Sequence, residues 1–395
     1  MSAPIFEPRR RELLLAAMAV LSGCGGVDSG GTGTGASSTY ASGPITGFGS
    51  IIVNGVRFDD TDAFIDDDDG SIRSRGDLKL GMRTEVIASA VAVSGGVSSA
   101  TAASIRLRRE IVGPLEAVDA ARGRLTVLGQ RVNIVATTVF DSAIVNGIAA
   151  LVPGELLEIH ATLDVAAGRY VASRIERRAS AAAYTLRGAV LSLSLAARTL
   201  TMGSATIDWS AVAPTDPANA LALGHLVQVT LETTPIVAGV WRARALIANL
   251  PPPEDRDFVE VEGRITAFTS PASFMLNGLA VDASTAAFAN GSASLGLGTK
   301  IEATGSLRNG VLLASQIKLE DDEGGPEAFE LSGNITSVDT AAMQFVVRGV
   351  TVMWSASTRF DGGTAANIVP GRRVEAKGRL STNGSLIEAT SVHFD

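Results

Sequence analysis

The fold of this chain is decided by a short pattern, clearest in Ser50-Ile51-Ile52-Val53-Asn54-Gly55-Val56-Arg57-Phe58. Apolar residues alternate on both sides of an Asn-Gly pair, which is the strongest short-range signal of a β-hairpin with a two-residue turn. Asn277-Gly278 stands at the matching place further along, and single glycines take that place in three other stretches, at Gly129, Gly203 and Gly349. The pattern therefore predicts five hairpins of one kind.

Two other glycines recur around each hairpin at nearly constant spacing. The first set is Gly43, Gly113, Gly188, Gly263 and Gly333, and the second is Gly81, Gly154, Gly224, Gly298 and Gly371. A repeat of about 70 residues indicates one small unit copied in tandem. The predicted units are module 1 (43–110), module 2 (111–182), module 3 (183–257), module 4 (258–328) and module 5 (329–395).

Each module ends with two more strand-like stretches. The first covers residues 83–86, 156–159, 226–229, 300–303 and 373–376, and the second covers 102–105, 172–175, 243–246, 314–317 and 389–392. Five or six short strands with this spacing of turns predict a small closed antiparallel β-barrel, OB-like in kind, with a two-sheet sandwich as the alternative. The predicted fold class is all-β, with five tandem barrels. Short, stiff linkers predict a semi-rigid string.

The N-terminus reads as a processing segment. Arg9 to Arg11 precede a short apolar run, which is too short to span a bilayer. Leu21-Ser22-Gly23-Cys24 resembles the lipobox of bacterial lipoproteins, so we expect a signal peptide at 1–23 and lipidation of Cys24. Gly25 in place of aspartate favours sorting to the outer membrane of a Gram-negative cell. Residues 24–42, rich in Gly, Ser and Thr, are expected to form a flexible tether.

The composition bounds the partners. Removing residues 1–23, with three arginines and two glutamates, leaves 30 basic and 39 acidic residues and a net charge of −9. Only 5% of residues are aromatic. Nucleic-acid binding needs basic grooves and stacking platforms, so we expect no nucleic-acid partner. Cys24 is the single cysteine, so no disulfide can form within the chain.

The repeated stretches resemble a known family. Residues 43–58 combine Gly-x-Ile-Thr, an apolar strand and Asn-Gly-Val, and Gly371 to Gly378 read Gly-Arg-Arg-Val-Glu-Ala-Lys-Gly. Gly298 to Gly305 read in the same way. This combination is similar to the bacterial domain-of-unknown-function 5666 family, most clearly in modules 1, 4 and 5, whereas modules 2 and 3 diverge. The resemblance implies secreted or lipidated proteins with tandem small β domains, and supplies no activity and no catalytic residues.

One acidic run is a candidate metal site. Asp66, Asp67, Asp68 and Asp69 precede Gly70. The run lacks the ligand spacing of an EF-hand, because Ile65 and Gly76 stand where that motif needs acidic residues. We interpret it as an Asp-Gly turn with a solvated acidic rim, and weak calcium binding by the loop is the alternative.

The most persistent polar position lies on one strand of every module. It is occupied by Glu85, Glu158, Gln228, Glu302 and Glu375. Its apolar neighbours alternate with it, so the side chain is predicted to point outward and to pair with arginine across strands. The alternative is an acidic stripe that meets a cationic partner. Arginines near the module junctions, at 106, 108, 109, 174, 177 and 178, are interpreted as exposed strand ends, with an anion site as the alternative.

No catalytic constellation emerges from the sequence. His160, His225 and His393 stand in separate modules, without the partners that a metal site or a nucleophile would need. We therefore expect no catalytic residue and no cofactor. The predicted protein is a lipid-anchored component of the cell envelope that acts as a non-catalytic binding, scaffold or spacer array, with a protein or a glycan as its ligand. The alternatives are an envelope hydrolase acting on glycans and a weak calcium-binding array.

Overall fold

The computed structural model describes residues 39–212, 221–248, 253–289, 291, 294–325 and 327–394. The expected signal peptide, Cys24 and the tether up to residue 38 lie outside these residues. The described part is all-β, as predicted, and its helical segments are four short 3₁₀ turns: η2 (Arg75–Asp77), η3 (Ala120–Arg122), η4 (Gly147–Ala150) and η5 (Ala365–Asn367). None of the described helical segments has the length and apolar character needed to cross a membrane.

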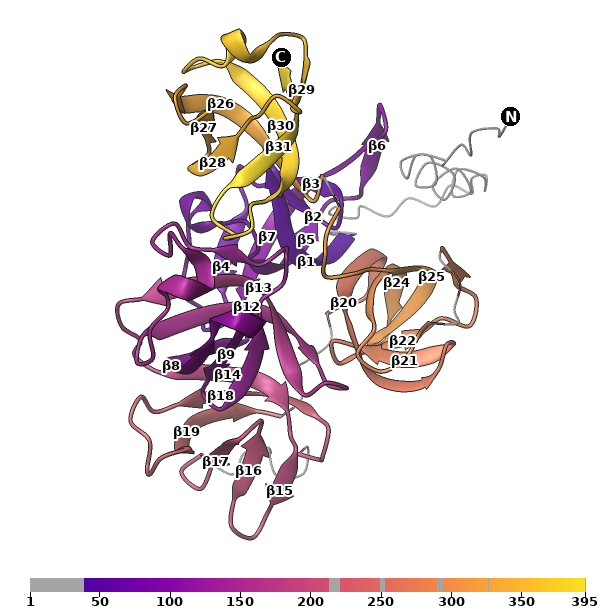
Figure 1. Cartoon of the computed structure of the whole chain (residues 1–395). Coiled ribbons are helices and arrows are strands. Elements are labelled where there is room, and N and C mark those ends of the chain that lie inside the picture. Colours follow the sequence, from indigo (N-terminus) through magenta and orange to yellow (C-terminus); the bar gives the residue numbers. More distant parts are fainter. Residues whose placement is uncertain are drawn as a thin grey trace, which may run out of the picture.

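The strands fall into five successive groups (Figure 1). Module 1 contains β1 (Thr39–Phe48), β2 (Ile51–Val53), β3 (Val56–Asp59), β4 (Phe64–Asp67), β5 (Arg83–Ala88), β6 (Ala92–Ser94) and β7 (Val97–Arg108). Module 2 contains β8 (Ile111–Asp119), β9 (Arg124–Val127), β10 (Gln130–Asn133), β11 (Val139–Phe140), β12 (Leu156–Asp164) and β13 (Arg169–Arg178). Module 3 contains β14 (Tyr184–Ala189), β15 (Ser192–Ser194), β16 (Thr199–Met202), β17 (Ala205–Asp208), β18 (Leu226–Leu231) and β19 (Val240–Ile247).

The last two groups repeat this plan. Module 4 contains β20 (Arg256–Ser270), β21 (Ser273–Leu276), β22 (Leu279–Asp282), β23 (Ala287–Phe288), β24 (Lys300–Arg308) and β25 (Val311–Leu319). Module 5 contains β26 (Phe329–Asp339), β27 (Gln344–Val347), β28 (Val350–Met353), β29 (Arg359–Asp361), β30 (Arg373–Leu380) and β31 (Ile387–Phe394).

Each group closes into a small barrel. In module 5, β26, β27 and β28 form an antiparallel meander, β28 pairs in parallel with β31, and β30 bridges β31 back to β26. Module 4 closes in the same order through β20, β21, β22, β25 and β24. This five-stranded closure is the OB-like barrel that the strand spacing predicts, rather than the sandwich.

The hairpin and the first recurring glycine fit together. Asn54 and Gly55 have φ angles of 52° and 83°, and Val53 faces Val56 across the turn, so the predicted two-residue turn forms. The side chain of Asn54 folds back over Gly43, where a Cβ would collide with it. Asn277 lies over Gly263 in the same way. The first glycine recurs at a fixed distance before the hairpin because the turn packs directly on it and leaves no room for a Cβ.

The second recurring glycine closes each barrel by one repeated contact. All five residues have positive φ angles, between 79° and 97°. Each donates its N–H at 2.7–2.8 Å to a carbonyl of the module's first strand or, in module 3, of the residue that directly follows that strand. The pairs are Gly81 with Ile45, Gly154 with Leu115, Gly224 with Val190, Gly298 with Ile265 and Gly371 with Ile335.

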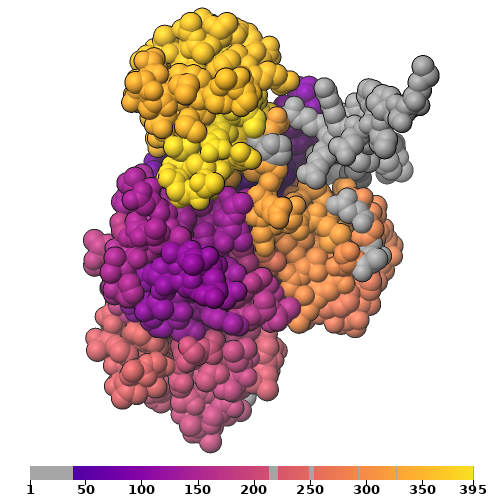
Figure 2. All heavy atoms as spheres, in the orientation of Figure 1, coloured from indigo at the N-terminus to yellow at the C-terminus, as the bar shows by residue number. Residues whose placement is uncertain are grey.

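The modules pack together, so the expected semi-rigid string is wrong (Figures 1 and 2). Strand β1 pairs in parallel with β20 of module 4 through residues 39–42 and with β26 of module 5 through residues 47–48. Strand β8 of module 2 pairs with β14 of module 3. Modules 1 and 5 share one hydrophobic core, and modules 2 and 3 share another. A sequence repeat does not predict main-chain pairing between modules, because that pairing depends on which strand edges of the separate barrels come together.

The expected tether of residues 24–42 is wrong at its last four residues. Residues 39–42 form the first part of β1, which pairs with β5 as well as with β20. Thr39 and Ala41 are fully buried, and Tyr40, 6% exposed, belongs to the hydrophobic core of module 4. The small polar residues around this segment give no strand signal in the sequence, because the strand is stabilised by its tertiary partners rather than by local propensity.

Candidate functional site

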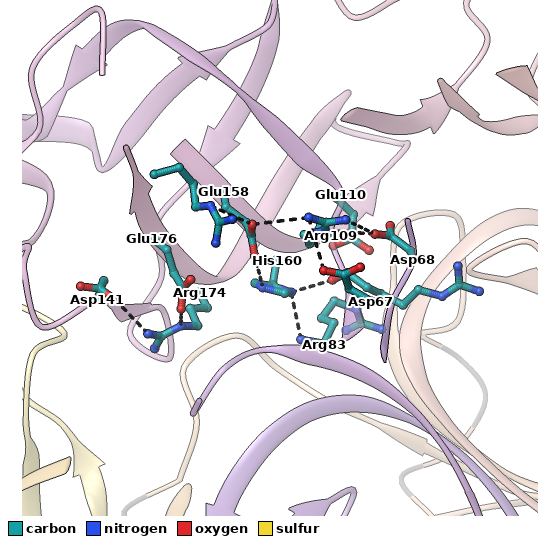
Figure 3. Close-up of polar contacts among 12 residues, drawn as sticks. Asp67, Asp68, Arg83, Arg109, Glu110, Asp141, Glu158, His160, Arg174 and Glu176 are labelled. Carbon is teal, nitrogen blue, oxygen red and sulfur yellow. Dashed lines mark hydrogen bonds and ion pairs between the residues drawn. The ribbon is translucent and has the colours of Figure 1, made fainter. Parts of the chain in front are cut away.

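A buried ionic network joins modules 1 and 2 (Figure 3). At its centre is Arg109, which follows β7 and has a side chain only 7% exposed. Its guanidinium lies 2.8 Å from a carboxylate oxygen of Asp68, 2.8 Å from one of Asp69 and 3.8 Å from one of Glu158. Several carboxylates thus share one buried cation. The interpretation of Arg109 as an exposed strand end is wrong, because module 2 covers it.

The acidic loop faces arginines rather than water. Asp66 pairs with Arg106 at 2.8 Å, and Asp67, 1% exposed, pairs with Arg73 at 2.6 Å. The Gly70 N–H donates to the carbonyl of Asp67, so the loop does turn at Gly70. The expected solvated rim is wrong for Asp66, Asp67 and Asp68, whose side chains are buried, and only Asp69 of the four is exposed. Within the described residues, no group of three or more His, Cys, Asp or Glu side chains is arranged to hold a metal ion.

His160 and Glu158 complete the network from module 2. His160 is fully buried, with Nδ1 2.6 Å from the Arg108 carbonyl oxygen and Nε2 3.4 Å from Glu158. Burial by itself would raise the pKa of Glu158, but His160, Arg109 and Arg178 outweigh it and lower the pKa to about 2. The contacts of His160 fix one module on the next. His393, in contrast, lies 3.0 Å from Asp361 on the exposed edge of module 5.

The recurrent polar position lies on the outer face of the barrels, where neighbouring modules pack. Gln228 of module 3 lies 3.5 Å from Asp68 of module 1, and Glu375 of module 5 lies 3.1 Å from Arg57 of module 1. Glu158 reaches Arg109, as described above. In three modules this side chain therefore contacts module 1, so the cationic partners of the predicted stripe include this chain's own arginines.

The remaining two members of that position behave differently. Glu85 pairs with Arg108 at 2.7 Å. Glu302 of module 4 stands opposite Lys318 in the strand register. Burial raises the pKa of Glu302 to about 7, because Lys318 offsets only part of the desolvation and Glu320 and Glu262 add repulsion.

A cavity of about 610 Å³ lies where modules 1, 2, 3 and 4 meet. Its charged lining comes from strands and junctions outside module 4: Arg83, Glu85, Arg108, Glu110 and Arg187. The lining from module 4 carries no charged side chain and is mainly apolar, including Val261, Met275, Leu276, Leu279 and Ala280. Cavities of roughly 300–1,000 Å³ with a few placed polar groups are typical of small-molecule sites.

The main chain around the charged lining is held firmly. The N–H of Arg187 donates to the carbonyl of Glu110 at 2.8 Å, and the hydroxyl of Tyr170 donates to the carbonyl of Arg187 at 2.6 Å. The carboxylate of Glu110 accepts the N–H of Ala161 at 2.9 Å. Burial raises the pKa of Glu110, while Arg83 and Arg187 oppose that shift. The cavity is thus preformed by contacts that cross module boundaries.

The sequence did not single out Arg187, Arg83 or Tyr40. One signal was available, because Arg187 directly precedes the anchor Gly188, where the first strand starts its turn into the barrel. The other modules have Ser42, Val112, Glu262 and Ser332 at that place. A cation unique to one copy of a repeat marks a position that has diverged. The residues that surround Arg187 are determined by how the modules pack, and the sequence pattern does not predict that packing.

Three regions of the chain match the family described as "Domain of unknown function (DUF5666)": residues 112–176, 262–318 and 332–393. These regions fall in modules 2, 4 and 5. Module 2, expected to diverge, is among them, whereas module 1, expected to match, is not. No curated protein matches the chain. Among solved structures, "drosophila Unr CSD456" matches with 11% identity over 78% of this chain and 99% of that one, at a TM-score of 0.14.

Proposed function

We propose that this chain, three of whose five barrels match DUF5666, is a non-catalytic binding protein of the cell envelope. In this proposal a lipidated Cys24 anchors the chain to a membrane, and the packed modules bind a small molecule between them. The lipobox-like Leu21 to Cys24 and the tract that follows support the anchor. A lipid anchor and the expected tether would hold the modules near molecules of the envelope.

One observation carries the binding function, namely the cavity of about 610 Å³ between four modules. A spacer would need only end-to-end barrels, whereas here the modules gather around a shared space. Main-chain contacts such as that between Arg187 and Glu110 keep this space open. A preformed site binds with a smaller ordering cost than one that must assemble around its ligand.

A non-catalytic role is supported better than the glycan-hydrolase alternative. Glu85 and Glu110 both line the cavity, and a pair of carboxylates is what such an enzyme would need. Each is already engaged, however, because Glu85 pairs with Arg108 at 2.7 Å and Glu110 accepts the N–H of Ala161. These contacts favour a structural role for both carboxylates.

Filling the cavity tests the binding function. Ala280→Trp places a large side chain into the lining, and Ala342→Trp, at an exposed turn of module 5, is the matched control. A small-molecule extract of the cell envelope is expected to raise the melting temperature of the wild type and of Ala342→Trp. A ligand at 100 times its Kd stabilises by about 2.7 kcal/mol. The melting temperature of Ala280→Trp with extract is compared with that of the same variant without extract. If the extract raises it as much as it raises that of the wild type, the cavity is not the binding site.

Replacing the lipidated cysteine tests the anchor. Cys24→Ser removes the thiol that would carry the acyl chains, so the full chain is expected to move from the membrane fraction to the soluble fraction. The measurement is an immunoblot of fractionated cells, with Ser29→Ala in the same tract as the control. Retention of the serine variant in the membrane fraction would count against lipid anchoring.

A further inference from the structure

We propose that the cavity between modules 1 to 4 binds an amphiphilic carboxylate, with its head on Arg187 and its apolar part against module 4. This inference deepens the proposed binding function and rests on it. Three features of the cavity support it, namely the bonding of Arg187, the charge balance of the lining and the apolar contribution of module 4.

Arg187 is placed as a receptor for an anion. Its main chain is fixed on both sides, by Glu110 and by Tyr170. Its side chain lines the cavity, and its guanidinium forms no hydrogen bond or ion pair with any residue in the described part of the chain. The other two arginines of the lining are engaged, because Arg83 donates to the Glu262 carbonyl and Arg108 pairs with Glu85.

Arg187 is half-buried, and a guanidinium without a bonded acceptor in such a place gains from binding an anion. A cation removed from water loses solvation that only a counter-charge or hydrogen-bond acceptors can replace. Burial and the nearby Arg108 lower the pKa of Arg187, and Glu110, Glu85 and Asp68 offset only part of that shift. Because arginine stays protonated in proteins, the strain is relieved by an anion rather than by loss of a proton.

The charge balance favours a single negative charge on the ligand. Arg83, Arg108 and Arg187 face Glu85 and Glu110 in the lining, so the formal sum is +1. A carboxylate would neutralise this sum and can accept two N–H donors of the guanidinium fork. A phosphate dianion would add a second charge close to the two glutamates, which repel it.

Module 4 determines the rest of the ligand. The strands β21 and β22 supply Met275, Leu276, Leu279 and Ala280, and Leu226 of module 3 adds to this apolar lining. Apolar lining of this kind stabilises alkyl groups by about 0.8 kcal/mol for each buried CH₂. A sugar, with hydroxyls on every face, would leave its polar groups unpaired there. The ligand class is therefore a monocarboxylate with an aliphatic body.

Calorimetric titration at pH 7.5 tests this class on the full mature protein. The probes are dodecanoate, dodecanol with the same tail and a neutral head, and inorganic phosphate. We expect dodecanoate to bind, dodecanol to bind at least tenfold more weakly, and phosphate to show no binding. In Arg187→Gln the affinity for dodecanoate should fall roughly 10- to 100-fold, because charged hydrogen bonds are lost. Arg187→Lys should recover part of that loss, and the exposed Arg242→Gln is the control.

The outcomes separate the two proposals. Equal binding of dodecanoate and dodecanol, or unchanged dodecanoate affinity in Arg187→Gln and Arg187→Lys, overturns the carboxylate class. Binding of phosphate without dodecanoate overturns it as well. In each of these cases the binding function stands if Ala280→Trp still abolishes the extract-induced rise in melting temperature. If that rise persists in Ala280→Trp, the proposed function itself has failed.

Discussion

Replacing Arg109 by methionine should lower the free energy of unfolding by about 3–5 kcal/mol, the usual cost of removing one partner from a buried ion pair. Methionine fills a similar volume but leaves Asp67, Asp68 and Glu158 without the cation that they share. Those carboxylates cannot all regain water, because their side chains are only 1–5% exposed. Urea denaturation followed by circular dichroism measures the change.

The matched control for this substitution is Arg122→Ala. Arg122 pairs with Asp119 on the exposed surface of module 2, 3.1 Å away, so its loss should leave stability almost unchanged. A neutral or stabilising effect of Arg109→Met, as seen when apolar residues replace some buried ion pairs, would contradict this prediction. That result would mean that packing, rather than charge, holds modules 1 and 2 together.

The same network predicts a dependence on pH. The pKa of Glu158 is about 2 in the folded chain, below its ordinary value of 4.5. A lowered acid pKa stabilises the fold above the unfolded value, and this contribution is lost as the pH falls from about 4.5 towards 2. Because Arg109 is one cause of the shift, Arg109→Met should flatten this part of the stability profile.

Local patterns were sufficient to predict the barrels. Asn54 and Gly55 define a turn by their own backbone preferences, and the second recurring glycine must adopt a positive φ wherever the chain reuses the same closure. These preferences act over a few residues and reappear at every copy. For that reason, periodicity was enough to predict an all-β chain of OB-like units.

Module packing could not be predicted in the same way. Arg109 pairs with Asp69, about 40 residues earlier in the chain, and with Glu158, about 50 residues later. The sequence shows such residues only as charges at junctions or on outer faces, where exposure is the usual outcome. The cavity depends on the relative placement of four modules, and no periodic signal encodes that placement.

The first four residues of β1 offer the second large effect. A chain that begins at Gly43, where the glycine repeat starts the module, should lose the docking of module 4. Residues 39–42 pair with both β20 and β5, and Tyr40 lies in the core of module 4. A buried aromatic side chain covers roughly 150–250 Å². At about 25 cal/mol per Å², this gives an upper value of about 4–6 kcal/mol.

The shortened chain separates local folding from assembly. The shorter chain keeps the strands of modules 2 to 5 and, in module 1, the pairs of Gly43 with Thr84 and Pro44 with Arg83 between β1 and β5, so circular dichroism should still report β structure. Small-angle scattering should show a larger radius, because module 4 is no longer docked. A chain that begins at Ser38 keeps β1 whole and is the control. Tyr40 and Ser42 also line the cavity, so the shorter chain should lose ligand binding at the same time. Equal radius and equal stability for the two chains would mean that contacts such as Arg83 with Glu262 suffice to dock module 4 without β1.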